Sequence, residues 1–200
     1  MNKKIVHDAL ILMAFSLVLG CALGGVYQIT KPAIEAADLA KAQEAYRAVF
    51  SNAETFNELE YDVDAANAMM TEKGFSDTID NVQEAIIGGE VAGHVVTVTA
   101  KDGSQGAITL SVGVQADGTV NGYSITAHSE TPGLGAKAVE PEFSSQFEGK
   151  NVDSFVVVKS APAADNEIES ITGSTITSKA VANACNAAKV YAQSLVGGAQ

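Results

Sequence analysis

The chain contains no tryptophan, few aromatic residues and only two cysteines, Cys21 and Cys185. Cys21 lies in an apolar run and Cys185 in an expected helix, so we expect no disulfide between them. No group of cysteines or histidines has the spacing of a metal site, and two distant cysteines cannot hold an iron–sulfur cluster. If this protein transfers electrons, an organic cofactor must carry them.

Basic residues are also scarce. Lysine and arginine number 12 against 24 aspartate and glutamate, which gives a formal net charge of -12. Nucleic-acid binding needs a basic surface, so this composition argues against it. The length of 200 residues suits one domain with an additional anchor or tail, and the hydrophobic content of 46% is enough to build a core.

Charged residues are absent from positions 9–29. A helix of that length spans about 30 Å, the thickness of the hydrocarbon core of a bilayer. Because Lys3 and Lys4 precede the run, we expect a single-pass protein of the plasma or inner membrane with a cytoplasmic N-terminus and an extracytoplasmic remainder. Two alternatives remain open: a cleaved signal peptide, and a lipoprotein anchored at Cys21.

The rest of the chain predicts an α+β fold. Leu39, Ala42, Tyr46, Val49 and Phe50 recur at helical spacing, which indicates an arm that either docks partner subunits or covers the protein's own sheet. Pro32 suits the first turn of this further helix. Residues 51–80 indicate no clear element. We therefore divide the chain into a cytoplasmic tip and transmembrane helix (1–30), a membrane-proximal helical arm (31–80) and a folded domain (81–200).

Within the domain, β-branched and large apolar residues predict an antiparallel meander with strands at 85–87, 91–100, 107–116 and 119–127. Turns are expected at 101–103 and 116–118. A helix around 138–147, a strand at 155–159 and a final helix after Ser178 complete the antiparallel sheet domain with its flanking helices. His94 lies within a strand, where a structural role is the more common one.

A hydroxyl-rich stretch, residues 169–178, precedes the final helix. Gly173 can adopt a backbone conformation that other residues avoid, and Thr177 or Ser178 can cap the helix. Ile171 and Ile176 flank the turn and can pin it to a core. A tight turn into a helix N-terminus suits an anion, so the stretch is either a plain helix cap or a phosphate site.

A second irregular stretch is Glu130-Thr131-Pro132-Gly133-Leu134-Gly135. Proline and two glycines let a backbone approach a ligand closely, although composition alone favours a plain turn after a strand. His128 and Glu130 could form an acid–base pair, but we assign no catalytic residue and no metal ligand.

Glu169 to Thr175 resembles the covalent-flavin motif of the FMN-binding domain family: an acidic residue, two residues, Ser or Thr, Gly, Ala or Ser, and Thr. In that family a flavin transferase uses FAD to attach FMN to the last threonine through a phosphodiester bond. The matching residue is Thr175; Glu169 stands where Asp is usual, and Ser174 where Ala is usual. The stretch from Glu130 to Gly135 matches the family's loop beside the flavin. The resemblance therefore implies FMN contacts from Thr172, Gly173, Ser174, Thr175, Thr177, Glu130, Thr131, Pro132, Gly133, Leu134 and Gly135.

The order of these features resembles the G subunits of Rnf complexes, which are membrane ferredoxin:NAD oxidoreductases coupled to ion transport. The resemblance implies a flavoprotein that relays electrons to other membrane subunits and does not turn over alone. The C subunits of sodium-translocating NADH:quinone reductases, which are usually longer, are the second candidate. A membrane-anchored interaction module with an unmodified Thr175 is the alternative without redox chemistry.

Overall fold

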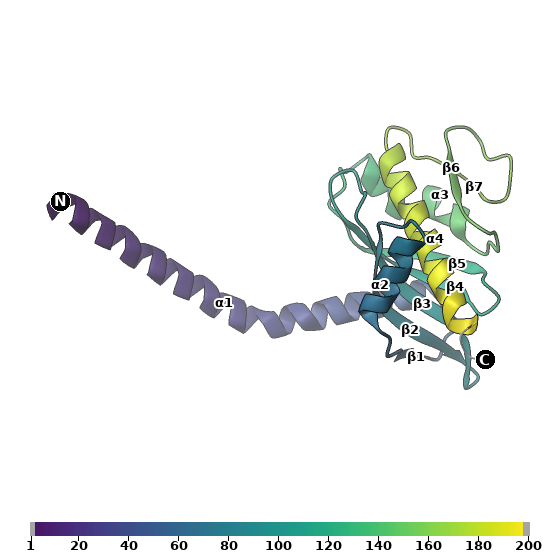
Figure 1. The fold of residues 1–200 in the computed structure, drawn as a ribbon, viewed down its shortest axis with the longest axis horizontal. Coiled ribbons are helices and arrows are strands. Elements are labelled where there is room, and N and C mark those ends of the chain that lie inside the picture. Colours follow the sequence, from purple (N-terminus) through teal and green to yellow (C-terminus); the bar gives the residue numbers. More distant parts are fainter. Residues whose placement is uncertain (1–2, 198–200) are drawn as a thin grey trace. The chain divides into compact units, whose positions relative to one another are not determined.

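The structure, a computed structural model, describes residues 3–197 (Figure 1). It forms two compact units, one up to Lys41 and one from Ala42. In chain order the elements are α1 (Lys3–Val49), β1 (Thr55–Glu58), α2 (Val63–Glu72), β2 (Thr78–Ile87), β3 (Glu90–Ala100), β4 (Ile108–Gln115), β5 (Val120–Ala127), η1 (Gly135–Val139), α3 (Pro141–Ser144), η2 (Ser145–Phe147), β6 (Val156–Val158), β7 (Glu167–Glu169) and α4 (Thr175–Gly197).

The first unit consists of the greater part of α1. By length and composition α1 can cross a membrane, and its apolar window is exposed throughout. The prediction of a separate helix starting at Pro32 is wrong, because α1 continues through Pro32 to Val49. Proline removes one backbone hydrogen bond, and the helix is maintained on both sides of it.

The second unit is built on a five-stranded antiparallel sheet in the order β1-β2-β3-β4-β5. This confirms the expected meander and its fold class. The connection from β3 to β4 is a loop over residues 101–107 rather than a three-residue turn, whereas Gly118 forms the expected tight turn before β5 with a φ of +87°. Residues 51–80 contain β1, α2 and the start of β2, which the sequence did not indicate. The boundaries at residues 30 and 80 stay a prediction.

Side chains of the sheet alternate between two faces, and each face carries a core. Val96 and Val98 of β3 pack in the larger cluster with residues of α2 and α4, such as Met70 and Val181. Val95 faces the other way and packs with a second cluster that includes Tyr46, Val49 and Phe50. The last turns of α1 therefore cover the protein's own sheet, one of the two roles expected for the arm.

The segment after β5 carries three short elements, η1, α3 and η2, where one helix at 138–147 was expected. Glu140 is extended, with a ψ of 143°, and Pro141 starts α3, so the helix cannot run through this point. Its aromatic side chains nevertheless reach the core. The Phe147 ring lies 5.2 Å from Tyr123, 5.5 Å from Phe143 and 4.9 Å from Phe155, measured between ring centroids.

Candidate functional site

The hydroxyl-rich stretch leaves β7, turns at Gly173 and enters α4. Gly173 has a φ of +79°, as the sequence predicted. The helix begins at Thr175, four residues before the expected start at Lys179, so neither Thr177 nor Ser178 is its N-cap. Instead the Ser178 hydroxyl donates to Ser174 O (2.9 Å) and accepts from Ile171 N (3.0 Å). Ser178 holds the turn from within the first turns of α4.

The two isoleucines of the stretch differ. Ile171 is 9% exposed and packs in the main core, whereas Ile176 is 60% exposed. The expectation that Ile176 would pin the turn is therefore wrong. Ile176 lies in the first turn of α4 with its side chain exposed, and Ile171 supplies the apolar anchor of the stretch.

Thr175 is the first helical residue and is partly exposed. The Ser178 amide donates to Ser174 O and closes the first helical turn. The amides of Thr175, Ile176 and Thr177 therefore have no carbonyl partner within the helix. These N–H groups and the helix dipole favour an anion at the Thr175 side chain. Within the described chain, the hydrogen bonds that hold this loop use Ser178 and Thr177, not the Thr175 hydroxyl.

The loop from Glu130 to Gly135 lies directly against this turn. The Thr177 hydroxyl donates to Glu130 Oε2 at 2.9 Å, across 47 positions of sequence. A Cβ added at Gly173 would be 3.4 Å from Leu134 Cδ2. The structure thus brings the two sequence motifs into contact. Glu130 and Gly135 are buried in this loop, whereas Thr131, Pro132, Gly133 and Leu134 are exposed.

A third segment, the β3–β4 loop, joins the site through Glu130. The Gln105 amide donates to Glu130 Oε1 at 3.1 Å. A Cβ at Gly103 would lie 2.1 Å from Gly106 O and 3.1 Å from the same carboxylate oxygen. The sequence indicated only a turn at residues 101–103. Gly103 and Gly106 are a sequence signal for an irregular loop here. Nothing in the sequence indicated that this loop would contact Glu130.

The two histidines considered in the sequence take no part in acid–base pairing. His128 Nδ1 accepts a hydrogen bond from the backbone amide of Glu130 (3.2 Å), whose carboxylate faces Thr177 and Gln105 instead. His94 is 7% exposed within β3, and burial lowers its pKa below the usual value.

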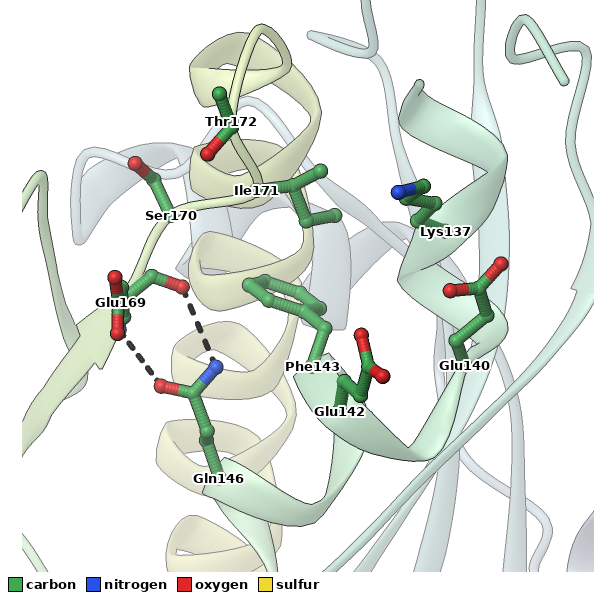
Figure 2. Close-up of a pocket in the computed structure, with 9 residues that line it drawn as sticks. All are labelled: Lys137, Glu140, Glu142, Phe143, Gln146, Glu169, Ser170, Ile171 and Thr172. Atoms are coloured by element: carbon green, nitrogen blue, oxygen red, sulfur yellow. Dashed lines mark hydrogen bonds between the residues drawn. The ribbon is translucent and has the colours of Figure 1, made fainter. Parts of the chain in front are cut away.

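A pocket of about 210 Å³ adjoins the hydroxyl-rich turn (Figure 2). Its walls come from the segment after β5 and from the residues between β7 and Gly173. The lining residues are Lys137, Glu140, Glu142, Phe143, Gln146, Glu169, Ser170, Ile171 and Thr172. It combines apolar surface from Phe143 and Ile171 with charged groups at its rim.

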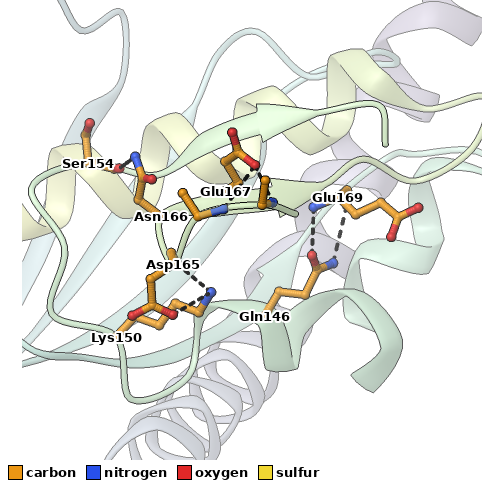
Figure 3. A network of polar contacts seen from close by, with 9 residues as sticks. Gln146, Lys150, Ser154, Asp165, Asn166, Glu167 and Glu169 are labelled. Carbon is orange, nitrogen blue, oxygen red and sulfur yellow. Dashed lines mark hydrogen bonds and ion pairs between the residues drawn. The ribbon is translucent and has the colours of Figure 1, made fainter. Parts of the chain in front are cut away.

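Polar contacts fix the strand that leads into the turn (Figure 3). Gln146 bonds to the backbone of Glu169, and Glu167 Oε2 accepts from the amides of Ala163 and Ala164 at 2.6 and 3.3 Å. Lys150 Nζ donates to Asp165 O at 2.6 Å. These contacts therefore fix the position of the backbone on the N-terminal side of Ile171, which packs in the core.

Two family models match this chain: the FMN-binding domain over residues 103–189, and the RnfG N-terminal region over residues 1–49. The FMN-binding match contains the hydroxyl-rich stretch, the loop from Glu130 to Gly135 and the part of the β3–β4 loop from Gly103 onward. The two matches together cover the membrane-type helix and the site-bearing part of the sheet unit.

The chain is 36% identical to the G subunit of the Na(+)-translocating ferredoxin:NAD(+) oxidoreductase complex of Acetobacterium woodii, over 92% of this chain and 89% of that protein. It is 33% identical to the G subunit of the proton-translocating complex of Clostridium ljungdahlii, over 90% and 86% of the two chains.

Solved structures of a related fold are Shewanella oneidensis NqrC and the C subunit of the Na(+)-translocating NADH-quinone reductase of Parabacteroides distasonis. Both have a TM-score of 0.50, with identities of 21% and 24%. The alignment with the Shewanella oneidensis protein covers 60% of this chain and 61% of that one. The alignment with the Parabacteroides distasonis protein covers 74% of this chain and 79% of that one. These likenesses show the fold. The relatives and the family models show that this chain belongs to the family of G subunits of Rnf ion-translocating oxidoreductase complexes.

Proposed function

We propose that this chain is an electron-carrying subunit of a membrane-bound ion-translocating ferredoxin:NAD oxidoreductase, and that Thr175 holds FMN through a phosphodiester bond. The observation that carries the proposal is the place of Thr175. It is the first residue of α4, partly exposed, beside the loop of the second motif. The names of its relatives and the FMN-binding family model support the redox role.

The site suits the phosphate end of the cofactor. A phosphodiester on Thr175 would carry one negative charge beside the free amides of residues 175–177 and the positive end of the helix dipole. Thr172 and Gly173 are exposed on the preceding turn, where hydroxyl and backbone groups can solvate that charge. Ser174 is buried, and its carbonyl is bound by Ser178, so it shapes the turn.

The surface around Thr175 suits a flat apolar ring. Leu134, Val139 and Ile176 are 45%, 52% and 60% exposed, and they lie on the loop, η1 and α4 that surround the motif. Gly133, with a φ of +77°, allows the backbone after Pro132 to turn within the loop. We infer that Thr131 to Gly135 packs against the isoalloxazine ring. When bound, FMN supplies one- and two-electron redox chemistry; the chain supplies attachment, orientation and charge.

The remaining parts of the proposal concern assembly. The relatives are named as subunits of complexes, so we infer that other membrane subunits exchange electrons with this one. A flavin transferase that uses FAD would make the bond. We further infer that α1 crosses the membrane once, with Lys3 and Lys4 in the cytoplasm and the acidic sheet unit outside.

The test is the mass of the peptide that contains Thr175, from full-length chain produced with an active flavin transferase. We expect a gain of one FMN less one water. Thr175→Ala should abolish it, and Ser170→Ala, which removes a hydroxyl at a variable position of the motif, should retain it. An unmodified peptide, with the transferase shown to modify another substrate, would reject covalent attachment and favour an interaction module without redox chemistry.

A further inference from the structure

Glu130 is a buried carboxylate in a loop whose next four residues are exposed. It is 6% exposed, and within the described chain it forms no ion pair with a lysine or arginine. Its two oxygens instead accept from neutral donors: Oε2 from the Thr177 hydroxyl at 2.9 Å and Oε1 from the Gln105 amide at 3.1 Å. Burying a carboxylate is costly unless it is hydrogen-bonded, so the bonds from Thr177 and Gln105 are needed to hold Glu130 in this position.

The carboxylate packs closely against two glycines. A Cβ at Gly135 would lie 2.1 Å from Glu130 Oε2 and 2.7 Å from Thr177 Oγ1. On the other side, a Cβ at Gly103 would lie 3.1 Å from Glu130 Oε1. Two glycines from different segments therefore make space for one side chain, which joins the β3–β4 loop, the second motif and the first turn of α4.

We propose that Glu130 is a positioning residue for attachment of FMN at Thr175, and that it acts through Thr177. This inference rests on the proposed function. Thr177 is fully buried and lies two residues after Thr175 in the same helical turn. Its bond to Glu130 ties that turn to the loop on which the ring would pack. Without the carboxylate, the Thr177 hydroxyl would turn to a carbonyl of its own helix, and the loop would separate from Thr175.

The chemistry of attachment explains why position matters. The Thr175 oxygen bonds to the FMN phosphorus of FAD, the bond from that phosphorus to the AMP portion breaks, and the hydroxyl proton passes to a base of the transferase. Small displacements of a reacting group cost large factors in rate. Glu130 faces Thr177 rather than Thr175, so it does not itself supply that base.

The experiment compares Glu130→Ala, Glu130→Gln, Thr177→Val and the double variant Glu130→Ala/Thr177→Val in the full-length chain. The rate of modification with transferase and FAD is followed by intact mass. Visible circular dichroism of the loaded protein reports how the flavin is held. Thr177→Ser retains the hydroxyl, and Asp153→Asn removes an exposed carboxylate outside the site. Thermal unfolding of each unloaded variant identifies any that do not fold.

We expect Glu130→Ala and Thr177→Val each to slow modification about tenfold to a hundredfold, the range for losing a hydrogen bond to a charged group. The double variant should be no slower than the slower single one, because the two side chains act through one bond. Both single variants should also change the circular dichroism signal. Thr177→Ser and Asp153→Asn should match the unchanged chain.

Wild-type rate and spectrum in a folded Glu130→Ala chain, or losses that multiply in the double variant, would overturn the inference. If Glu130→Ala does not fold, the modification rates of Glu130→Gln and Thr177→Val test the inference instead, because each substitution weakens the bond between Glu130 and Thr177. If the unchanged chain is not modified at all, the proposed function itself fails and this inference fails with it.

Discussion

The side-chain amide of Gln146 pairs with both backbone polar groups of Glu169. Gln146 Oε1 accepts from Glu169 N at 2.7 Å, and Gln146 Nε2 donates to Glu169 O at 3.3 Å (Figure 2). On its other side β7 pairs with β6, and Ser170 N donates to Val158 O at 2.8 Å. Gln146 thus takes the place of a neighbouring strand and leaves the Glu169 carboxylate exposed.

Gln146→Ala is expected to lower the free energy of unfolding by about 1 to 2 kcal/mol, because two hydrogen bonds to the backbone are lost. Gln146→Glu should behave similarly, since a carboxylate cannot donate to Glu169 O. Urea unfolding followed by far-ultraviolet circular dichroism measures both. Gln105→Ala is the matched control, because only the backbone amide of Gln105 contacts Glu130. Equal stability of Gln146→Ala and this control would contradict the role of the pair.

Gly135→Ala is expected to destabilise the sheet unit more than Gly173→Ala does. At Gly135 the new methyl group would lie 2.1 Å from Glu130 Oε2. At Gly173 the nearest atom is 3.4 Å away, so the loss of stability comes from placing an alanine at a positive φ, about 1 to 2 kcal/mol. Gly149→Ala isolates the second effect, because Gly149 has a φ of +68° and open space around it. Denaturant midpoints should therefore rank Gly149 and Gly173 together and Gly135 below them; the reverse order would reject the steric account.

Asp77 predicts a specific dependence of stability on pH. Burial, then the nearby Asp102 charge, raises its pKa to about 6, while Lys101 partly opposes the shift. The folded chain therefore holds this proton more tightly than the unfolded chain does. The resulting stabilisation is fully present below about pH 4, the pKa of an unfolded aspartate, and is lost as the pH rises through about 6. Above that, a charged Asp77, 4% exposed and near the buried Cys185 thiol, destabilises the fold.

Asp77→Asn is accordingly expected to raise the free energy of unfolding at about pH 7.5 by about 1 to 3 kcal/mol and to flatten its dependence between about pH 4 and 6. Guanidinium unfolding at a series of pH values checks this. Asp153→Asn, at an exposed carboxylate, should leave the dependence unchanged. A steeper dependence in Asp77→Asn would show that the carboxylate is stabilised in its charged form.

The end of α1 is expected to be part of the folded sheet unit. Tyr46, Val49 and Phe50 are buried against Ala85 and Val95. A variant that begins at Ala42 should fold, whereas one that begins at Ser51 should lose on the order of 5 kcal/mol, because it exposes three large apolar side chains and the strand face beneath them. Urea unfolding of the two variants measures the difference. Equal stability would show that the second cluster contributes nothing.

The sequence predicted the strands well because β-branched residues and turn signals coincide at β3, β4 and β5. It did not indicate β1 or α2, whose short patterns are mixed and polar. The helix start was misplaced because several residues of the Ser/Thr run are good N-caps by type. Only the tertiary bonds of Ser178 and Thr177 assign them other roles.

The sequence predicted Thr175 and both motifs as parts of a candidate site, but it did not predict how the two motifs contact each other. Local patterns carry no information on which distant segment a side chain will meet. Gln105 donates to Glu130 through its backbone amide, which every residue except proline has. The residue type at position 105 therefore could not predict this hydrogen bond. Gln146 is likewise an ordinary surface residue by sequence, and its role follows only from the position of β7.

The order of segments along the chain has a consequence for the timing of assembly. The five strands pair with their sequence neighbours, so the sheet can form from local contacts. The candidate acceptor threonine lies on α4, which follows all of them, and its neighbours come from loops tens of residues earlier. The docking of α4 adds its buried residues to the main core and brings Thr175 beside the loop that contains Glu130. On the proposed function, a transferase that reads this surface would modify folded chains and pass over unfinished ones.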